Sequence, residues 1–193
     1  MNQLARSPEL MRSDDTALLV IDLQEKLLPL IDENECIVFN AQRLIRGAEV
    51  LGVPCAGTEQ YPKGLGPTTA AIRERLESFE EKLDFSCMEC QTIFDAWKAS
   101  ERHKVLVCGI ETHVCVQQTV LDLLANGFAV YVAVDAVGAR HSIDHETALR
   151  RMEGGGAVLT TTEAALFEWC GRAGTDRFKE ISRLIKEGDV RRS

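Results

Sequence analysis

The chain alternates between short apolar runs and longer stretches in which apolar residues recur every three or four positions. The runs predict buried strands at 16–22, 53–58, 104–110, 128–134 and 157–160. The longer stretches predict helices at 33–52, 69–76, 91–100, 114–127, 143–152, 162–170 and 176–186. The segment 61–67 is rich in Pro and Gly and indicates a loop. This alternation predicts an α/β fold of three layers, with helices on both faces of a mostly parallel central sheet.

Composition narrows the class of protein. The 193 residues can bury a sizeable core, and no repeat or linker divides them, so we expect one domain over 1–193 with flexible tails at 1–14 and 188–193. The net charge of -8 argues against nucleic acid as a partner. No apolar run approaches the roughly 20 residues of a membrane span, so no membrane partner is expected, and the N-terminus lacks the apolar segment of a signal peptide. Seven cysteines spread through strands and helices favour reduced thiols in the cytoplasm over a disulfide framework.

Cys115 lies between the predicted strand at 104–110 and the helix that follows it. Gly109 and the polar residues 111–113 interrupt the apolar run, which places Cys115 in the first turn of that helix. Unpaired backbone N–H groups at a helix start favour a thiolate and can receive an oxyanion. A nucleophilic thiol is one interpretation, and a small core residue is the other, because free cysteine is among the most buried residue types.

Several polar residues fall at or just past the carboxyl end of a predicted strand. They are Asp22, Glu59, Cys115 and Asp135. Ligands of parallel sheets bind beyond the carboxyl ends of the strands. These four side chains form one site only if their strands lie near one another.

Other motifs carry weaker signals. Cys87-Met-Glu-Cys90 has the spacing of half a zinc site, but no second pair completes it. His141 and His145 lie four residues apart without the Glu of a metalloprotease motif, which favours solvated residues at a helix start. The segment 80–82, Glu-Glu-Lys, indicates by itself only a solvated charge run.

Four segments together resemble the isochorismatase-like family of cysteine hydrolases. They are Leu18–Gln24, Thr58–Pro62 with Gly64-Leu-Gly66, Lys82–Cys87, and Gly109–Val116 with Thr119 and Gly127. Their order and spacing match over about residues 15–170, and the Asp-x-Gln and Gly-x-x-Thr-x-x-Cys-Val segments are specific in combination. The resemblance implies a Rossmann-like α/β/α fold.

The resemblance also implies the residues of the site. It implies a catalytic triad of Asp22, Lys82 and Cys115, and a non-proline cis peptide bond between Ile110 and Glu111. That bond would turn the Glu111 N–H toward the oxyanion, beside the N–H of Cys115. The substrate pocket would be lined by Gln24, Glu59, Tyr61, Phe85 and His113.

The chemistry of this triad is acyl transfer. Lys82 and the helix start would favour the thiolate, so a depressed pKa is expected for Cys115. Asp22 would take the thiol proton and return it to a leaving amine. The implied activity is that of an amidase, which hydrolyses an amide or related acyl C–N bond of a small molecule. Family members that cleave a vinyl ether lack the cysteine, so Cys115 favours acyl chemistry.

No metal and no cofactor are expected. Nicotinamidases of the family carry an Asp-x-His metal motif after the second strand, whereas this chain has Thr58-Glu59-Gln60 there and its first histidine at 103. Nicotinamide should therefore be a poor substrate. The Thr-Glu-Gln-Tyr-Pro form resembles a subgroup of hydrolases without a defined substrate. The alternatives are an isochorismatase-type vinyl ether hydrolase and a non-catalytic oligomeric scaffold, and the resemblance favours a homo-oligomer.

Overall fold

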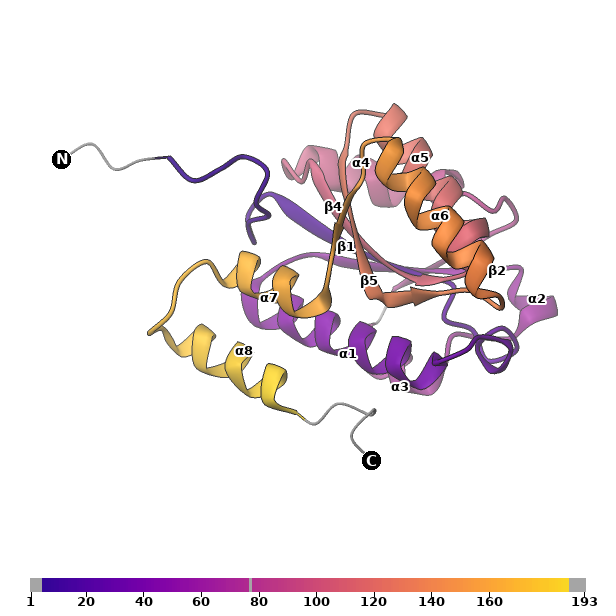
Figure 1. The fold of residues 1–193 in the computed structure, drawn as a ribbon, viewed down its shortest axis with the longest axis horizontal. Helices are drawn as coiled ribbons and strands as arrows, with labels where there is room; N and C mark the ends of the chain where they lie inside the picture. Colours follow the sequence, from indigo (N-terminus) through magenta and orange to yellow (C-terminus); the bar gives the residue numbers. More distant parts are fainter. Residues whose placement is uncertain (1–4, 77, 188–193) are drawn as a thin grey trace.

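A computed structural model describes residues 5–76 and 78–187 of the chain. Six strands form one sheet in the order β3-β2-β1-β4-β5-β6, and each neighbouring pair is parallel (Figure 1). The strands are β1 (Thr16–Ile21), β2 (Cys55–Gln60), β3 (Phe79–Lys82), β4 (Lys104–Ile110), β5 (Ala129–Gly138) and β6 (Val158–Thr160). The predicted α/β class is confirmed, with a sheet that is entirely parallel.

Helices cover both faces of the sheet (Figure 1). On one face lie α1 (Asn34–Leu51), α3 (Ala70–Arg73), α7 (Thr162–Cys170) and α8 (Asp176–Lys186), and on the other lie α4 (Gln91–Ala99), α5 (Gln117–Ala125) and α6 (Ser142–Gly154). Short helical segments are η1 (Leu28–Leu30), α2 (Pro62–Leu65), η2 (Cys87–Glu89) and the π-helical turn η3 (Thr112–Val116).

The central strands are apolar without interruption because both of their faces are buried. In β1, Leu18 and Val20 pack with α1, α7 and α8. Leu19 and Ile21 point the other way and join the core beneath α4 and α5. Successive side chains of a strand point to opposite faces, so a strand covered on both sides needs apolar residues at every position.

The structure differs from the sequence prediction in three segments: β3, 61–67 and the end of β5. β3 is an edge strand whose charged residues concealed it, and it pairs with β2 from Gly57 to Gln60. The predicted loop at 61–67 contains α2, with Pro62 at its first turn and Gly66 after its last residue. β5 continues through a register shift to Gly138 instead of ending at 134.

The segment 5–14 packs against the domain, whereas a flexible tail was expected there. Met11 is buried, and its N–H donates to the Glu168 carboxylate over 2.8 Å. The Lys104 ammonium donates to the carbonyl of Leu10 over 2.8 Å. Burial of an apolar side chain and pairing of a buried ammonium together fix this segment. The rest of the expected tails, 1–4 and 188–193, lie outside the described residues. Among the described residues, no helix is long and apolar enough to cross a bilayer.

Candidate active site

Asp22, Lys82 and Cys115 meet beyond the carboxyl ends of three strands. Asp22 follows β1, Lys82 ends β3 and Cys115 lies in η3 after β4. Nζ of Lys82 lies 2.8 Å from Oδ2 of Asp22, and both side chains are fully buried. The Cys115 thiol is close enough to both charges for each to act on its pKa. The structure therefore brings the three residues together.

The Lys82 side chain reaches across β2, which separates β3 from β1. Its ammonium donates to Oε1 of Gln60 over 2.6 Å and to the carbonyl of Phe85 over 3.0 Å. Burial lowers the pKa of Lys82, but the negative charges around it, led by Asp22, outweigh burial and raise the pKa above the ordinary value of 10.5. Lys82 is therefore a fixed, permanently charged neighbour of the Asp22 carboxylate.

Asp22 is held in an unusual backbone conformation. Its φ of 51° lies in the left-handed region, where a residue other than glycine stores on the order of 1–3 kcal/mol of strain. Its Oδ1 accepts the Thr58 hydroxyl over 2.8 Å, and its N–H donates to the Thr58 carbonyl over 3.2 Å. Two contacts with β2 and the ion pair with Lys82 thus determine where the carboxylate sits.

Gly109 allows β4 to approach β1 immediately before Asp22. The two strands pair Gly109 with Ile21, and a Cβ atom on Gly109 would lie 2.0 Å from the Ile21 carbonyl oxygen. Its φ of 121° is also open only to glycine. The next peptide bond, between Ile110 and Glu111, is cis, the geometry that the family resemblance implies.

Cys115 lies in a π-helical turn rather than in the first turn of a regular α-helix. The thiol is buried, with 5% of the residue exposed. Burial raises the pKa of the Cys115 thiol, Asp22 raises it further, and Lys82 acts in the opposite direction. The prediction of a depressed pKa is therefore wrong, because a helix start in the sequence does not reveal that the thiol is desolvated beside a carboxylate.

The turn around Cys115 is tied to other elements by side chains. The Thr119 hydroxyl donates to the Cys115 carbonyl over 2.6 Å and accepts the N–H of Cys87 over 2.9 Å. Nε of Arg140 donates to the Glu111 carboxylate over 2.9 Å. These contacts connect η3 to η2, to α5 and to the segment that precedes α6.

Two residues expected in the substrate pocket bind backbone groups of neighbouring segments. Gln24 is buried, and its amide donates to the carbonyls of Gln60 and Gly66 and accepts the N–H of Gln60. The Glu59 carboxylate accepts the N–H of Thr68 over 2.6 Å and lies 3.8 Å from the Arg73 guanidinium. Both side chains hold the segment that follows β2.

The other three expected pocket residues are more accessible. Tyr61 and Phe85 are 50% and 52% exposed. Tyr61, Lys82 and Leu83 are among the residues that line an open cavity of about 330 Å³. His113 is half-buried, and its Nε2 lies 3.9 Å from the Asp144 carboxylate of α6.

Asp135 does not join the site. It lies inside β5, and its carboxylate accepts the N–H and the hydroxyl of Thr162 over 2.8 and 3.0 Å, at the start of α7. Its expected place at a strand end was wrong because β5 runs past it. Thr58 and Gln60, by contrast, have no role predicted from the sequence, although they bind Asp22 and Lys82. The alternation of side chains along a strand was the available signal, because Thr58 and Gln60 share one face of β2 and Glu59 takes the other.

The cysteines are unpaired, and the described residues contain no group of three or more His, Cys, Asp or Glu side chains arranged to hold a metal ion. Cys87 and Cys90 are both buried. The Sγ of Cys87 lies 3.6 Å from the Thr58 hydroxyl, so a second thiol stands close to the Asp22 carboxylate.

Comparison with known proteins agrees with the sequence motifs. The isochorismatase domain family matches residues 16–164. Isochorismatase domain-containing protein 2A of Mus musculus is 40% identical over 175 residues, which cover 90% of this chain and 84% of the mouse protein. A solved structure of MAR1 ribonuclease from Caenorhabditis elegans has a TM-score of 0.88 at 39% identity, covering 93% of this chain and 94% of that one. The YcaC gene product of Escherichia coli, described as an octameric hydrolase of unknown specificity, has a TM-score of 0.82 at 22% identity and covers 94% of this chain and 97% of that one. The chain therefore belongs to the isochorismatase domain family.

Proposed function

We propose that the protein is a cysteine-dependent hydrolase of an amide or related acyl C–N bond in a small molecule. The observation that carries this proposal is the buried ion pair of Lys82 and Asp22 beside the Cys115 thiol. A fully buried ion pair is weak evidence for stability, because desolvation offsets much of the attraction between the charges. Perturbed ionisable groups gathered at the carboxyl edge of a parallel sheet favour a catalytic role.

The mechanism starts from a neutral thiol. Cys115 attacks the acyl carbon while its proton passes to Asp22, and the N–H groups of Glu111 and Cys115 receive the oxyanion. Asp22 then protonates the leaving amine, which leaves a thioester on Cys115. Water attacks the thioester, its proton passes to Asp22, and the released sulfur takes that proton back as the carboxylic acid departs.

The raised pKa of Cys115 supports general-base catalysis by Asp22. A protonated thiol needs a base close to it at the moment of attack, and the Asp22 carboxylate is the charged group that acts most strongly on the Cys115 thiol. Lys82 places an ammonium 2.8 Å from Oδ2 of Asp22, so the base is paired with a fixed positive charge. The role of Lys82 is thus to maintain the base rather than to create a resident thiolate.

The substrate is proposed to be a small uncharged amide or ureide, processed without a metal. The place of the nicotinamidase metal motif holds Glu59, which is already engaged by Thr68 and Arg73. Nicotinamide is therefore expected to be a poor substrate. RNA hydrolysis, suggested by the description of the Caenorhabditis elegans protein, is disfavoured by a net charge of -8, because a phosphodiester chain requires positive charge for binding.

The proposed setting is a homo-oligomer in the cytoplasm. The seven unpaired cysteines suit a reducing compartment. Leu83, Phe85 and Tyr61 expose large apolar side chains close to Lys82, and a second copy would shield them. Sedimentation velocity tests this point, since a monomer at micromolar concentration would contradict it.

A substrate panel tests the function. We expect hydrolysis of at least one member of a set of aliphatic amides, ureides and esters, with nicotinamide and RNA as further arms. Cys115→Ser and Asp22→Asn should each abolish turnover, whereas Cys87→Ala, which removes an equally buried thiol, should retain it. Turnover that survives in Cys115→Ser, or RNA cleavage in place of amide hydrolysis, would refute the proposal. Exhaustive chelation should leave activity unchanged.

A further inference from the structure

The turn that carries Cys115 is anchored by helix α6 as well as by its own backbone. Within the turn, the Glu111 carbonyl accepts the N–H groups of Val114 and Val116, and the Thr112 carbonyl accepts the N–H of Gln117. From α6, Nδ1 of His145 lies 3.0 Å from the Thr112 hydroxyl. Thr112 is fully buried and is the first residue of η3. His145 of α6 therefore binds the first residue of the turn that carries Cys115.

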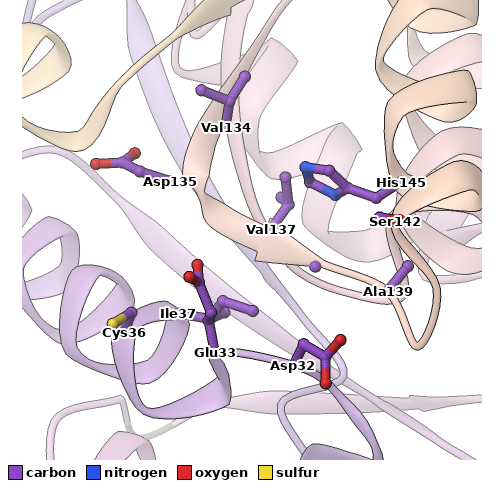
Figure 2. Close-up of a pocket in the computed structure, with 11 residues that line it drawn as sticks. Asp32, Glu33, Cys36, Ile37, Val134, Asp135, Val137, Ala139, Ser142 and His145 are labelled. Atoms are coloured by element: carbon purple, nitrogen blue, oxygen red, sulfur yellow. The ribbon is translucent and has the colours of Figure 1, made fainter. Parts of the chain in front are cut away.

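His145 also borders a separate cavity of about 230 Å³, whose lining contains none of the residues of the proposed triad. Figure 2 shows His145 and Ser142 of α6 across from Asp32 and Glu33, which precede α1, with Val137 of β5 between them. Burial lowers the pKa of His145, while Glu146 and Glu33 raise it. Asp32 and Asp135 complete the charged groups around this cavity. The imidazole is accordingly neutral at neutral pH, and either tautomer forms the bond with the Thr112 hydroxyl.

A π-helical turn is sensitive to such an anchor. Its hydrogen bonds join residues five apart along the chain, whereas those of an α-helix join residues four apart. It occurs mostly as an isolated turn within α-helical structure. Conversion to an α-turn would change the angular positions of the side chains near its C-terminal end, because successive residues of an α-helix lie about 100° apart around the axis. A change of this kind would carry the Cys115 thiol away from Asp22.

We propose that His145 is a positioning residue, which holds the Cys115 thiol against Asp22 through the hydroxyl of Thr112. This inference rests on the proposed function of Cys115 and Asp22. His145 touches neither the substrate nor the reacting sulfur, so its effect is on the population of the reactive geometry. The bond between Thr112 and His145 should therefore affect the rate of attack by Cys115 and leave substrate affinity unchanged.

A double-mutant cycle tests the proposal with the rate of Cys115 alkylation by iodoacetamide, measured by peptide mass spectrometry on the full chain. This rate requires no knowledge of the substrate and reports the reactivity of the Cys115 thiol directly. Thr112→Val and His145→Phe should each slow the alkylation by about tenfold, the effect of losing one good hydrogen bond. The double variant should be no slower than the slower single variant, because both changes break the same bond.

Two further variants separate positioning from general structural damage. His145→Asn keeps a polar group near the position of Nδ1 and should restore alkylation to within about threefold of the wild type. His141→Phe changes an exposed histidine beside the start of the same helix and should have no effect. With a substrate in hand, kcat should fall in His145→Phe at unchanged KM. If His145→Phe does not fold, the cycle is repeated with His145→Gln, whose amide extends past the position of Nδ1.

The outcomes distinguish the two proposals. If Cys115 of the wild type is alkylated no faster than the buried thiol of Cys87, both the proposed function and the role of His145 are refuted. If Cys115 is the preferred thiol while the effects of Thr112→Val and His145→Phe add independently, only the positioning role is refuted. Failure of His145→Asn to improve on His145→Phe would also overturn it.

Discussion

Nζ of Lys82 lies 2.8 Å from Oδ2 of Asp22, and neither side chain is exposed to solvent. Each charge stabilises the other in place of water, because little water reaches either group. The pair joins β1 to β3 across the intervening strand, so it contributes both to the sheet edge and to the proposed chemistry.

Replacement of Lys82 should therefore affect stability as well as turnover. Lys82→Met keeps most of the side-chain volume but leaves the Asp22 carboxylate without its partner, a change that costs about 3–5 kcal/mol in buried pairs. We expect lost activity and a lower urea midpoint, with the double variant Asp22→Asn/Lys82→Met more stable than Lys82→Met alone. Equal stability of Lys82→Met and the wild type would show that the ion pair is not desolvated.

The ion pair also sets a pH dependence. The pKa of Lys82 is raised in the folded protein above its ordinary value of 10.5. The stabilisation from protonated Lys82 is therefore fully present below that value and is lost as the pH rises through the folded-state pKa. The stability difference between the wild type and Lys82→Met should stay constant from neutral pH up to about 10.5 and then shrink. A difference that shrinks already between neutral pH and mildly alkaline pH would contradict this.

The resting thiol of Cys115 should be protonated. Burial and the Asp22 carboxylate raise its pKa, so the wild type and Cys115→Ser should show the same thiolate absorbance in the ultraviolet at neutral pH. Asp22→Asn is the comparison for this measurement. It removes the carboxylate that raises the pKa of the Cys115 thiol and leaves Lys82, which lowers that pKa, in place. A thiolate band in the wild type that is absent from Cys115→Ser would restore the original expectation of a depressed pKa.

Asp135 should matter for stability alone. Its carboxylate accepts the N–H and the hydroxyl of Thr162 at the start of α7. Loss of such a cap costs roughly 0.5–2 kcal/mol, so Asp135→Ala should unfold earlier in urea while turning over substrate at the wild-type rate. Asp22→Asn, at a true strand end, should instead abolish turnover. Loss of turnover in folded Asp135→Ala would contradict this and would show that Asp135 belongs to the active site.

The buried strands and long helices were predictable because their apolar periodicity reflects burial directly. β4 and α7 have the predicted bounds, since each is an apolar segment with clear limits. β3 was not predictable from periodicity, because an edge strand tolerates charged residues such as Glu80 and Glu81. The end of β5 was missed because a register shift lets the strand continue past Val134.

The candidate site was predictable in part. The pattern of strand ends placed Asp22 and Cys115, whereas Lys82 required the resemblance to a family, since its segment looked like solvated charge. The resemblance implies Gln24 and Glu59 in the pocket, but periodicity does not show that both side chains also bind backbone groups of nearby loops. The protonation state of Cys115 was predicted wrongly because it depends on burial by segments distant in the sequence.

The central claim is that Cys115 forms a covalent acyl intermediate, and trapping that intermediate tests it most directly. A hydrolysed member of the amide panel is mixed with the protein, the reaction is quenched with acid at early times, and peptides are mapped by mass spectrometry. We predict an added mass equal to the acyl group on the peptide that contains Cys115, present during turnover and absent after the substrate is exhausted. Asp22→Asn should show no adduct. Substrate hydrolysis at full rate with no adduct on Cys115, retained in Cys115→Ser, would contradict the account.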